Sequence, residues 1–153
     1  MNEPQSMVLV AIDFSEASHQ ALAWALDNAV GPHTALHLVH VIDDHVGDLR
    51  VLLGLEKERE RVDAEIAHIS EAAKGALARL SEADRADVGT VTHHVRRGRA
   101  ANEIAACARN LDTTLLVVGS HGHTGLERAL LGSVAERVVR LADCPVVVIK
   151  RRI

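Results

Sequence analysis

Short, continuous apolar runs alternate with segments of helical periodicity along the whole chain of 153 residues. Residues 7–12 form one such run, which stops at Asp13 and is typical of a strand buried on both faces of a sheet. The segment that follows has apolar residues three and four apart from Leu22 to Ala29, which predicts an amphipathic helix. Strands that alternate with helices form parallel sheets with right-handed crossovers, so the pattern predicts an α/β fold with a doubly wound sheet.

The same alternation continues beyond the first helix, for which Ser15 is the expected N-cap and Gly31-Pro32 the expected end. Further strands are predicted at residues 35–42, 88–95, 113–118 and 146–149, and further helices at residues 56–80, 100–110 and 133–141. One apolar stripe of the long helix is expected to face the core, formed by Val62, Ile66, Ile69, Ala73, Leu77 and Leu80. Because there is no internal repeat and no linker, residues 1–153 are predicted to form a single domain.

Composition limits the possible partners. The net charge of −4 argues against a nucleic-acid or anionic-membrane binder, which would carry a basic domain. No apolar run approaches the ~20 residues that a membrane span needs, and residues 1–6 lack the features of a secretory signal. We therefore expect a cytoplasmic protein, in which Cys107 and Cys144, without a CxxC or ligand spacing, are reduced thiols.

Two polar segments have alternative interpretations. Asp43-Asp44-His45 could supply metal ligands, but a polar loop after a strand is the commoner structure. The basic cluster Arg96-Arg97-Gly98-Arg99 could meet a phosphate, but a solvated strand end at a sheet edge is favoured.

A glycine-rich loop follows the predicted strand at residues 113–118. Gly119, Gly122, Gly132 and Ser133 have the spacing G-x2-G-x9-G-S, and the last two open a helix. Backbone N–H groups in such a loop, together with a helix N-terminus, form a site for an anion, typically phosphate. Ser133 and Glu136 also have the spacing of a capping box. The alternative is an ordinary glycine-rich turn between a strand and a helix.

Open α/β sheets bind ligands beyond the carboxyl ends of their strands, where the strand order reverses. If the first and fourth strands are central neighbours, the loop at residues 11–15 meets the glycine loop and Asp13 lies opposite the predicted phosphate site. The loop has no P-loop lysine, so the sequence favours binding over phosphoryl transfer. Within residues 119–125, His121 and His123 are the side-chain cations when protonated, and a His-x-His metal pair is the less favoured alternative.

These motifs resemble those of the ATP-binding universal stress proteins, whose nucleotide motif G-x2-G-x9-G-(S/T) is matched without a gap. The resemblance extends to Asp13-x-Ser15, to the second strand ending at Val41, to the Gly98…Glu103-Ile104 segment and to the Cys144-Pro145 strand. It implies a five-stranded parallel sheet of order 3-2-1-4-5 with helices on both faces, similar to the nucleotide-binding α-hydrolase class. It departs at Ala100, where many members have proline.

The resemblance also implies a site for ATP or another adenine nucleotide with Mg2+. Asp13 would lie near the ribose or phosphates and ligate the metal, Val41 would contact the adenine, and Gly122 and Gly132 would give backbone donors. The implied nucleotide-binding residues are Ala11, Asp13, Ser15, Val41, Val118, Gly119, His121, Gly122, Gly132, Ser133 and Val134.

The leading hypothesis is a nucleotide-binding sensor of the stress response, with a regulatory protein partner that the sequence does not name. The resemblance implies a homodimer through Val146–Ile149, which fits an apolar edge strand that needs covering. The alternatives are a slow ATPase or self-phosphorylating enzyme, a nucleotide-independent dimeric adaptor, and a cyclic-nucleotide binder.

Overall fold

The computed structural model describes residues 6–43, 58–78, 88–89, 91–121 and 131–150. A five-stranded sheet forms its centre, with every neighbouring pair parallel and the order β3-β2-β1-β4-β5. The predicted strand order is therefore confirmed. The strands are β1 (Ser6–Ala11), β2 (Thr34–Asp43), β3 (Val91–Gly98), β4 (Leu115–Gly119) and β5 (Val146–Ile149).

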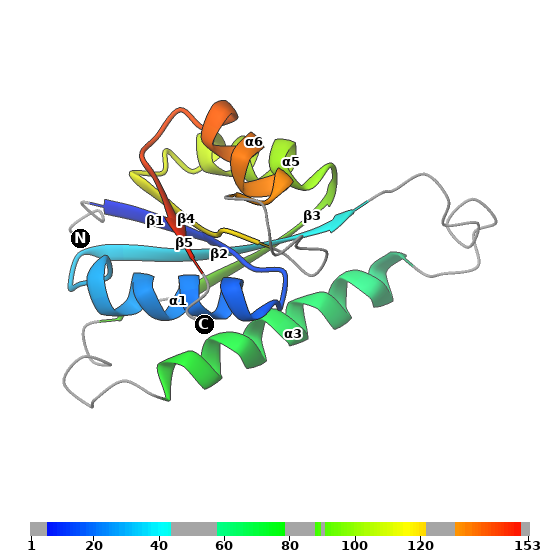
Figure 1. Cartoon of the computed structure of the whole chain (residues 1–153). Helices are drawn as coiled ribbons and strands as arrows, with labels where there is room; N and C mark the ends of the chain where they lie inside the picture. Colours follow the sequence, from blue (N-terminus) through cyan, green and yellow to red (C-terminus); the bar gives the residue numbers. More distant parts are fainter. Residues whose placement is uncertain (1–5, 44–57, 79–87, 90, 122–130, 151–153) are drawn as a thin grey trace.

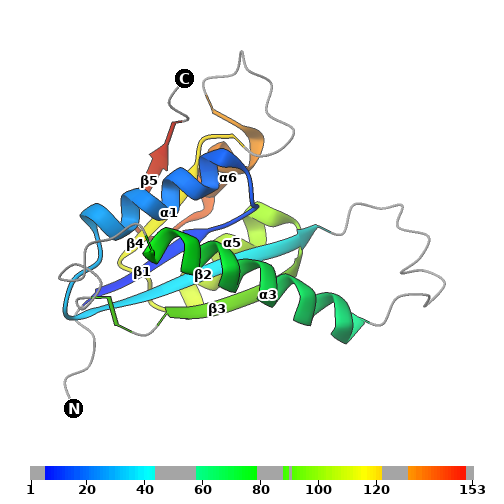
Figure 2. The ribbon, with the colours of Figure 1, turned by 90° about the horizontal axis from the view of Figure 1, so that it is seen from below.

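Helices cover both faces of this sheet, as predicted. In Figure 1, α5 (Ala100–Asn110) and α6 (Ser133–Leu141) lie above the strands, and α1 (Glu16–Asn28) and α3 (Glu58–Leu77) lie below them. The view from below in Figure 2 shows α1 and α3 side by side across the strands. The chain leaves the central pair β1 and β4 in opposite directions, so the switch point of the sheet lies between these two strands.

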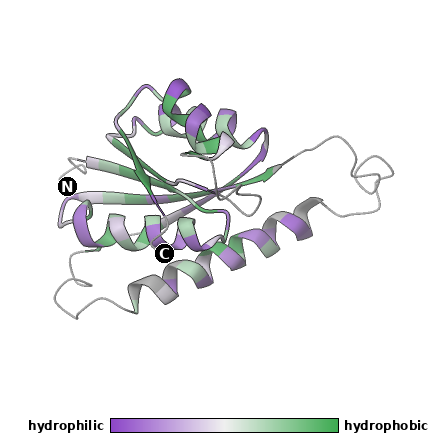
Figure 3. Ribbon diagram, in the orientation of Figure 1, coloured by the Kyte–Doolittle hydropathy of each residue, from purple (hydrophilic) through white to green (hydrophobic). Residues whose placement is uncertain are grey.

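The core consists of two apolar layers, one on each face of the sheet. Figure 3 shows apolar colour concentrated on the strands and polar colour on the outer faces of the helices. The layer under α1 and α3 includes Val10, Leu22, Leu38 and Ile69, each at most 1% exposed. The layer under α5 and α6 includes Leu9, Leu116 and Val138, each completely buried. Successive strand residues point to opposite layers, which accounts for the continuous apolar runs in the sequence.

The edge strand β3 begins and ends later than predicted. It spans Val91–Gly98, so Arg96 and Arg97 belong to the strand and pair opposite Val41 and Ile42 of β2. The predicted location of the basic cluster at a sheet edge is confirmed. An edge position accepts arginine because the long stem can cover apolar surface while the guanidinium reaches polar partners. Arg96 lies beside Cys107 of α5 and opposes the rise in the pKa of this thiol that burial causes.

The face of α3 that packs on the sheet differs from the predicted one. Ile69 is completely buried as expected, but Ile66 is 39% exposed. Glu65, one turn before Ile69, contacts the sheet instead, because it pairs with His40 of β2. The side chains of Val62, Ala73 and Leu77, and all of Leu80, lie outside the described part of the chain.

Two further expectations concern the cysteines and the membrane. Cys107 is buried, Cys144 is half-buried, and both are free thiols, as predicted. Among the residues that the structure describes, no helix has the length and apolar character of a membrane span.

Candidate functional site

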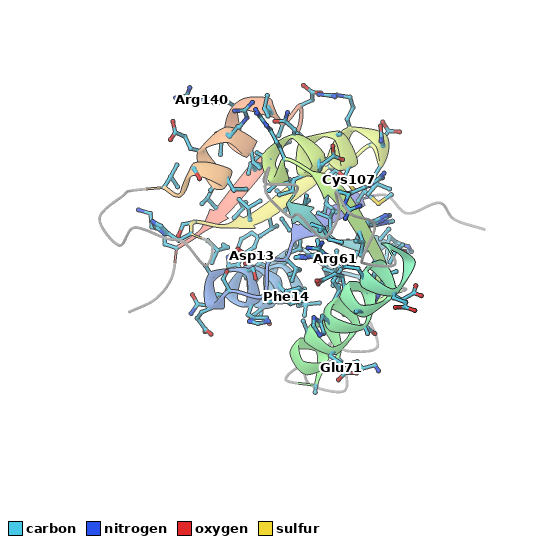
Figure 4. All side chains as sticks on the ribbon, turned by 90° about the vertical axis from the view of Figure 1, so that its right-hand side faces the viewer. Asp13, Phe14, Arg61, Glu71, Cys107 and Arg140 are labelled. Carbon is cyan, nitrogen blue, oxygen red and sulfur yellow. The ribbon has the colours of Figure 1, made fainter. Side chains whose placement is uncertain are left out.

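The loops after β1 and β4 leave the sheet side by side. Val10 of β1 pairs with Val117 of β4, so the loop that contains Asp13 and the loop that begins at Ser120 emerge from neighbouring strands at the same edge. Figure 4 views this edge and shows Asp13 and Phe14 together beside α1. The sequence predicts that the loops after the first and fourth strands lie side by side, and this prediction is confirmed.

Three of the implied nucleotide-binding residues share one face of the sheet near this edge. Ala11, Val41 and Val118 all belong to the apolar layer under α5 and α6. Val118 is 3% exposed, whereas Ala11 and Val41 are half-buried. Because Ala11 pairs with Val39, β2 continues beyond the end of β1 and carries Val41 past it. The result is a partly open apolar surface beside the Asp13 loop.

A network of hydrogen bonds orients the carboxylate of Asp13. The backbone N–H of Ser15 donates to Asp13 Oδ1 over 2.9 Å, and the Ser15 hydroxyl donates to the same oxygen. The Ser15 Oγ also accepts from the N–H of Ser18 at 3.2 Å, which confirms Ser15 as the N-cap of α1. Because Ser15 is 8% exposed and its hydroxyl is engaged within the chain, it serves the site by holding Asp13.

The residue between Asp13 and Ser15 has an uncommon backbone conformation. Phe14 has a φ of 64°, in the left-handed region that costs a non-glycine residue roughly 1–2 kcal/mol. Its ring lies against two histidines, with centroids 4.8 Å from His40 and 5.6 Å from His68. Sequence reasoning did not predict this strained residue, which lies at the switch point where strain often accompanies function.

Gly132 closes the glycine loop onto the end of β4. Its N–H donates to the carbonyl of Ser120 over 2.6 Å, and a Cβ at Gly132 would lie 2.8 Å from the same oxygen. Ser120 is 1% exposed, so the two ends of the loop are tied together at a buried point. The Gly132 N–H is thus engaged within the chain in this structure, and its proposed role as a phosphate donor would fall to the next amides of α6.

The predicted capping box at Ser133 is wrong. Gly132 has extended backbone angles and is the N-cap of α6, which makes Ser133 the first helical residue. The Glu136 carboxylate, 2.8 Å from an Arg140 nitrogen, forms an i,i+4 ion pair within the helix. No side chain among the described residues caps α6, and Ser133 and Val134 are exposed. The first turn of α6 therefore offers N–H groups that have no side-chain acceptor within the described ranges, which is the arrangement that favours an anion.

The remaining loop predictions lie partly outside the described residues. His121 is described, and its Nδ1 lies 2.9 Å from the Ser120 hydroxyl. Gly122 and His123 are outside the described ranges, as are Asp44 and His45. Within those ranges no group of three or more His, Cys, Asp and Glu residues could hold a metal ion.

His40 was missed as a residue of the site. It lies within the strand predicted at residues 35–42 and was given no role there, but its Nδ1 lies 2.8 Å from the carbonyl oxygen of Ile12 and its Nε2 lies 3.4 Å from Glu65 Oε2. A signal was available in the alternation of Leu36, Leu38, His40 and Ile42 on one face of the strand. A histidine at such an inward position requires polar partners.

Residues 6–150 match the model of the Universal stress protein family. The chain belongs to this family. The sequence resemblance therefore identified the family correctly.

Two relatives illustrate how far the similarity extends. This universal stress protein is 34% identical to the universal stress protein YxiE of Bacillus subtilis, covering 94% of this chain and 97% of the relative. It is 32% identical to the universal stress protein MJ0577 of Methanocaldococcus jannaschii, and the match covers 95% of this chain and 94% of the relative. The solved structure of MJ0577 covers 97% of this chain and 98% of its own, with a TM-score of 0.77.

A more distant member of the family shows the same fold with a ligand. A universal stress protein family protein of Arabidopsis thaliana, solved with AMP bound, has a TM-score of 0.63 and 21% identity. The match covers 96% of this universal stress protein and 92% of the Arabidopsis chain.

Proposed function

We propose that this protein binds an adenine nucleotide, ATP with Mg2+, at the carboxyl edge of the sheet between β1 and β4, and acts as a cytoplasmic nucleotide sensor. The observation that carries the proposal is the open N-terminus of α6. No side chain in the described part of the chain caps it, and it is tied to β4 through Gly132 and Ser120. The Arabidopsis relative with AMP bound supports the class of ligand.

The residues at this edge fit each part of the nucleotide. The backbone amides of the exposed residues Ser133 and Val134 suit the phosphates, and the apolar face formed by Ala11, Val41 and Val118 suits the nucleoside. Gly119 ends β4 at the same edge, and His121 adds a cation when protonated. The family resemblance also assigns Gly122, which lies outside the described residues, to the phosphates.

Asp13 fits a magnesium ion that is shared with phosphate. Mg2+ is usually held by one or two carboxylates together with phosphate oxygens and water, so a single oriented Asp is sufficient on the protein side. The ion would neutralise phosphate charge near this carboxylate. The two hydrogen bonds from Ser15 fix the carboxylate in advance.

Binding is favoured over catalysis because the chain has no P-loop lysine to stabilise a transferring phosphoryl group. A slow ATPase is the second candidate. It would release phosphate at a rate that depends on Asp13, whereas a sensor would return the nucleotide unchanged. The nucleotide-independent adaptor and the cyclic-nucleotide binder predict, respectively, no ATP binding and preference for a cyclic ligand.

Isothermal titration calorimetry with MgATP, AMP and cyclic AMP tests the proposal. Val134→Asp places a negative charge at the N-terminus of α6, where it stabilises the helix but repels phosphate. We expect this variant to keep its stability and lose at least about tenfold in MgATP affinity. His33→Asp is the matched control, since His33 is exposed near the amino end of β2 and far from the loops. Absence of saturable binding by the wild type, or equal binding by Val134→Asp, would reject the proposal.

A further inference from the structure

We propose that Glu65 and His40 are positioning residues through which helix α3 sets the conformation of the Asp13 loop and thereby the nucleotide affinity of the site. The affinity part rests on the proposed nucleotide binding. The structural part concerns only the contacts between α3, β2 and the loop after β1.

A continuous series of side-chain contacts links helix α3 to the Asp13 loop. Glu65 Oε2 of α3 lies 3.4 Å from His40 Nε2, and His40 Nδ1 lies 2.8 Å from the carbonyl oxygen of Ile12. The side chains of His40 and Glu65 are only 14% and 23% exposed, so water competes weakly for these partners. The Ile12 carbonyl belongs to the peptide bond that leads directly into Asp13.

The chemistry of the carbonyl fixes how the imidazole is oriented. A carbonyl oxygen can only accept a hydrogen bond, so the Nδ1 of His40 carries the proton that it donates to Ile12. His40 Nε2 then faces a carboxylate oxygen, and two acceptors would repel each other there. The 3.4 Å contact is favourable when a proton lies between Nε2 and Oε2. The carboxyl group of Glu65 therefore has a specific function in this place, which an apolar residue of similar size could not supply.

Phe14 makes the Asp13 loop sensitive to the contacts that link Glu65, His40 and Ile12. Its left-handed backbone is unfavourable for a phenylalanine, so the surrounding contacts must maintain it. The ring packs against His40 at 4.8 Å and edge-on against His68 at 5.6 Å. His68 Nδ1 in turn lies 3.8 Å from the same Glu65 oxygen, although its side chain is 68% exposed. Loss of the Glu65 carboxylate would weaken the support on both sides of Asp13, at Ile12 and at Phe14.

The consequence is coupling in both directions. If α3 favours the receptive loop conformation, nucleotide binding must stabilise the Glu65–His40 contact to the same extent, because coupling free energies are reciprocal. The apparent dissociation constant rises in proportion to the loss of the receptive population.

Three variants on α3 separate positioning from general stability. Glu65→Ala removes the contact. Glu65→Gln keeps a side-chain N–H that can donate to a neutral His40 Nε2. Glu71→Ala is the matched control on the same helix, because Glu71 is 75% exposed and its ion pair in the described structure is local, with Lys74 at 3.2 Å.

The measurements are MgATP affinity by calorimetry and backbone amide shifts at residues 12–15 by NMR, with the His40 ring tautomer recorded from its nitrogen shifts. We expect Glu65→Ala to weaken MgATP binding roughly 3- to 10-fold, the factor that corresponds to one lost hydrogen bond. It should also shift the Asp13 and Phe14 amides. Glu65→Gln and Glu71→Ala should stay within about twofold of the wild type and leave these amides in place.

Wild-type affinity and unchanged amides in Glu65→Ala would overturn the proposal, as would equal effects of Glu65→Ala and Glu71→Ala. If the wild type binds no MgATP, the proposed function fails, and the NMR comparison of the two alanine variants decides the positioning role without nucleotide. A His40 ring that lacks a proton on Nδ1 would contradict the assigned hydrogen bond to Ile12.

Discussion

Gly119 and Ala17 lie so close together that no side chain fits between them. A Cβ at Gly119 would lie 2.8 Å from the carbonyl carbon of Ala17 and 2.9 Å from its Cβ. This contact joins the end of β4 to the first turn of α1, whose N-cap Ser15 holds Asp13. The first glycine of the motif therefore sets the distance between the two loops of the candidate site.

Gly119→Ala is expected to destabilise the fold by about 1–3 kcal/mol, because the backbone of α1 would have to move away from β4. Gly75→Ala in α3 is the control. A Cβ there meets nothing within 4 Å, and the change should stabilise the helix by about 0.5–1 kcal/mol. Urea denaturation followed by circular dichroism measures both variants, and wild-type stability of Gly119→Ala would contradict the expectation.

The fold was largely predictable because each element carries its own local pattern. The bounds of α5, α6 and β5 agree with the prediction, and their sequences combine clear apolar periodicity with definite ends. The bounds of β3 were wrong because the alternation that begins at Val88 continues into Arg96 and Arg97. A charged pair suggests the end of a strand, but at a sheet edge it can remain inside one.

The candidate site was predictable only where its contacts are local. Asp13 and Ser15 are two residues apart, and their hydrogen bonds follow from helix capping. The contact between His40 and Glu65 joins a strand to a helix across a crossover, and no spacing in the sequence encodes it. The capping role of Ser133 was wrong although the helix bounds were right, because a glycine can also serve as N-cap and the choice depends on how the loop closes onto Ser120.

The stability of the fold should decrease at mildly acidic pH. Burial lowers the pKa values of His37, His93 and His94 below 6.5, and the charges of His37 and Arg96 lower that of His94 further. Below pH 6.5 the unfolded chain therefore binds more protons at these positions than the folded chain. The contribution of these neutral histidines to stability is present above the pKa of the unfolded state. It is lost as the pH falls through their lower pKa values in the folded state.

Urea denaturation at several pH values between about 7.5 and 5.5 tests this expectation. His94→Gln should reduce the loss of stability, because His94 faces His37 with ring nitrogens 2.7 Å apart. A wild-type stability that rises as the pH falls would contradict the assignment.

The proposed homodimer through β5 can be tested at the outer edge of that strand. Leu116 N–H donates to the carbonyl of Pro145, just before β5, and Ser120 N–H donates to the carbonyl of Ile149. The odd-numbered residues of this segment therefore direct their backbone groups toward β4. Val148 is one residue before Ile149, so it has the opposite alternation and directs its backbone N–H and C=O away from β4. Val148→Pro should therefore remove an outward N–H and leave the pairing with β4 intact.

We expect sedimentation equilibrium to give a dimer for the wild type and a monomer for Val148→Pro. Circular dichroism of the variant must remain that of a folded protein for the comparison to count. A monomeric wild type, or a folded Val148→Pro dimer, would exclude β5 as the dimer contact.

Removal of Mg2+ should weaken ATP binding, because the negative charge of Asp13 would then face the phosphates without a cation between them. Without the ion, the carboxylate and the phosphates repel each other; with it, both can share one cation. Asp13→Asn keeps an oxygen that can accept from Ser15 but removes the charge. We therefore expect EDTA to reduce the ATP affinity of the wild type at least about tenfold and that of Asp13→Asn by less than about threefold. Calorimetric titrations with and without EDTA measure this difference. An equal effect of EDTA on both proteins would place the metal away from Asp13, because the charge removed by the substitution would then have no part in the dependence on Mg2+.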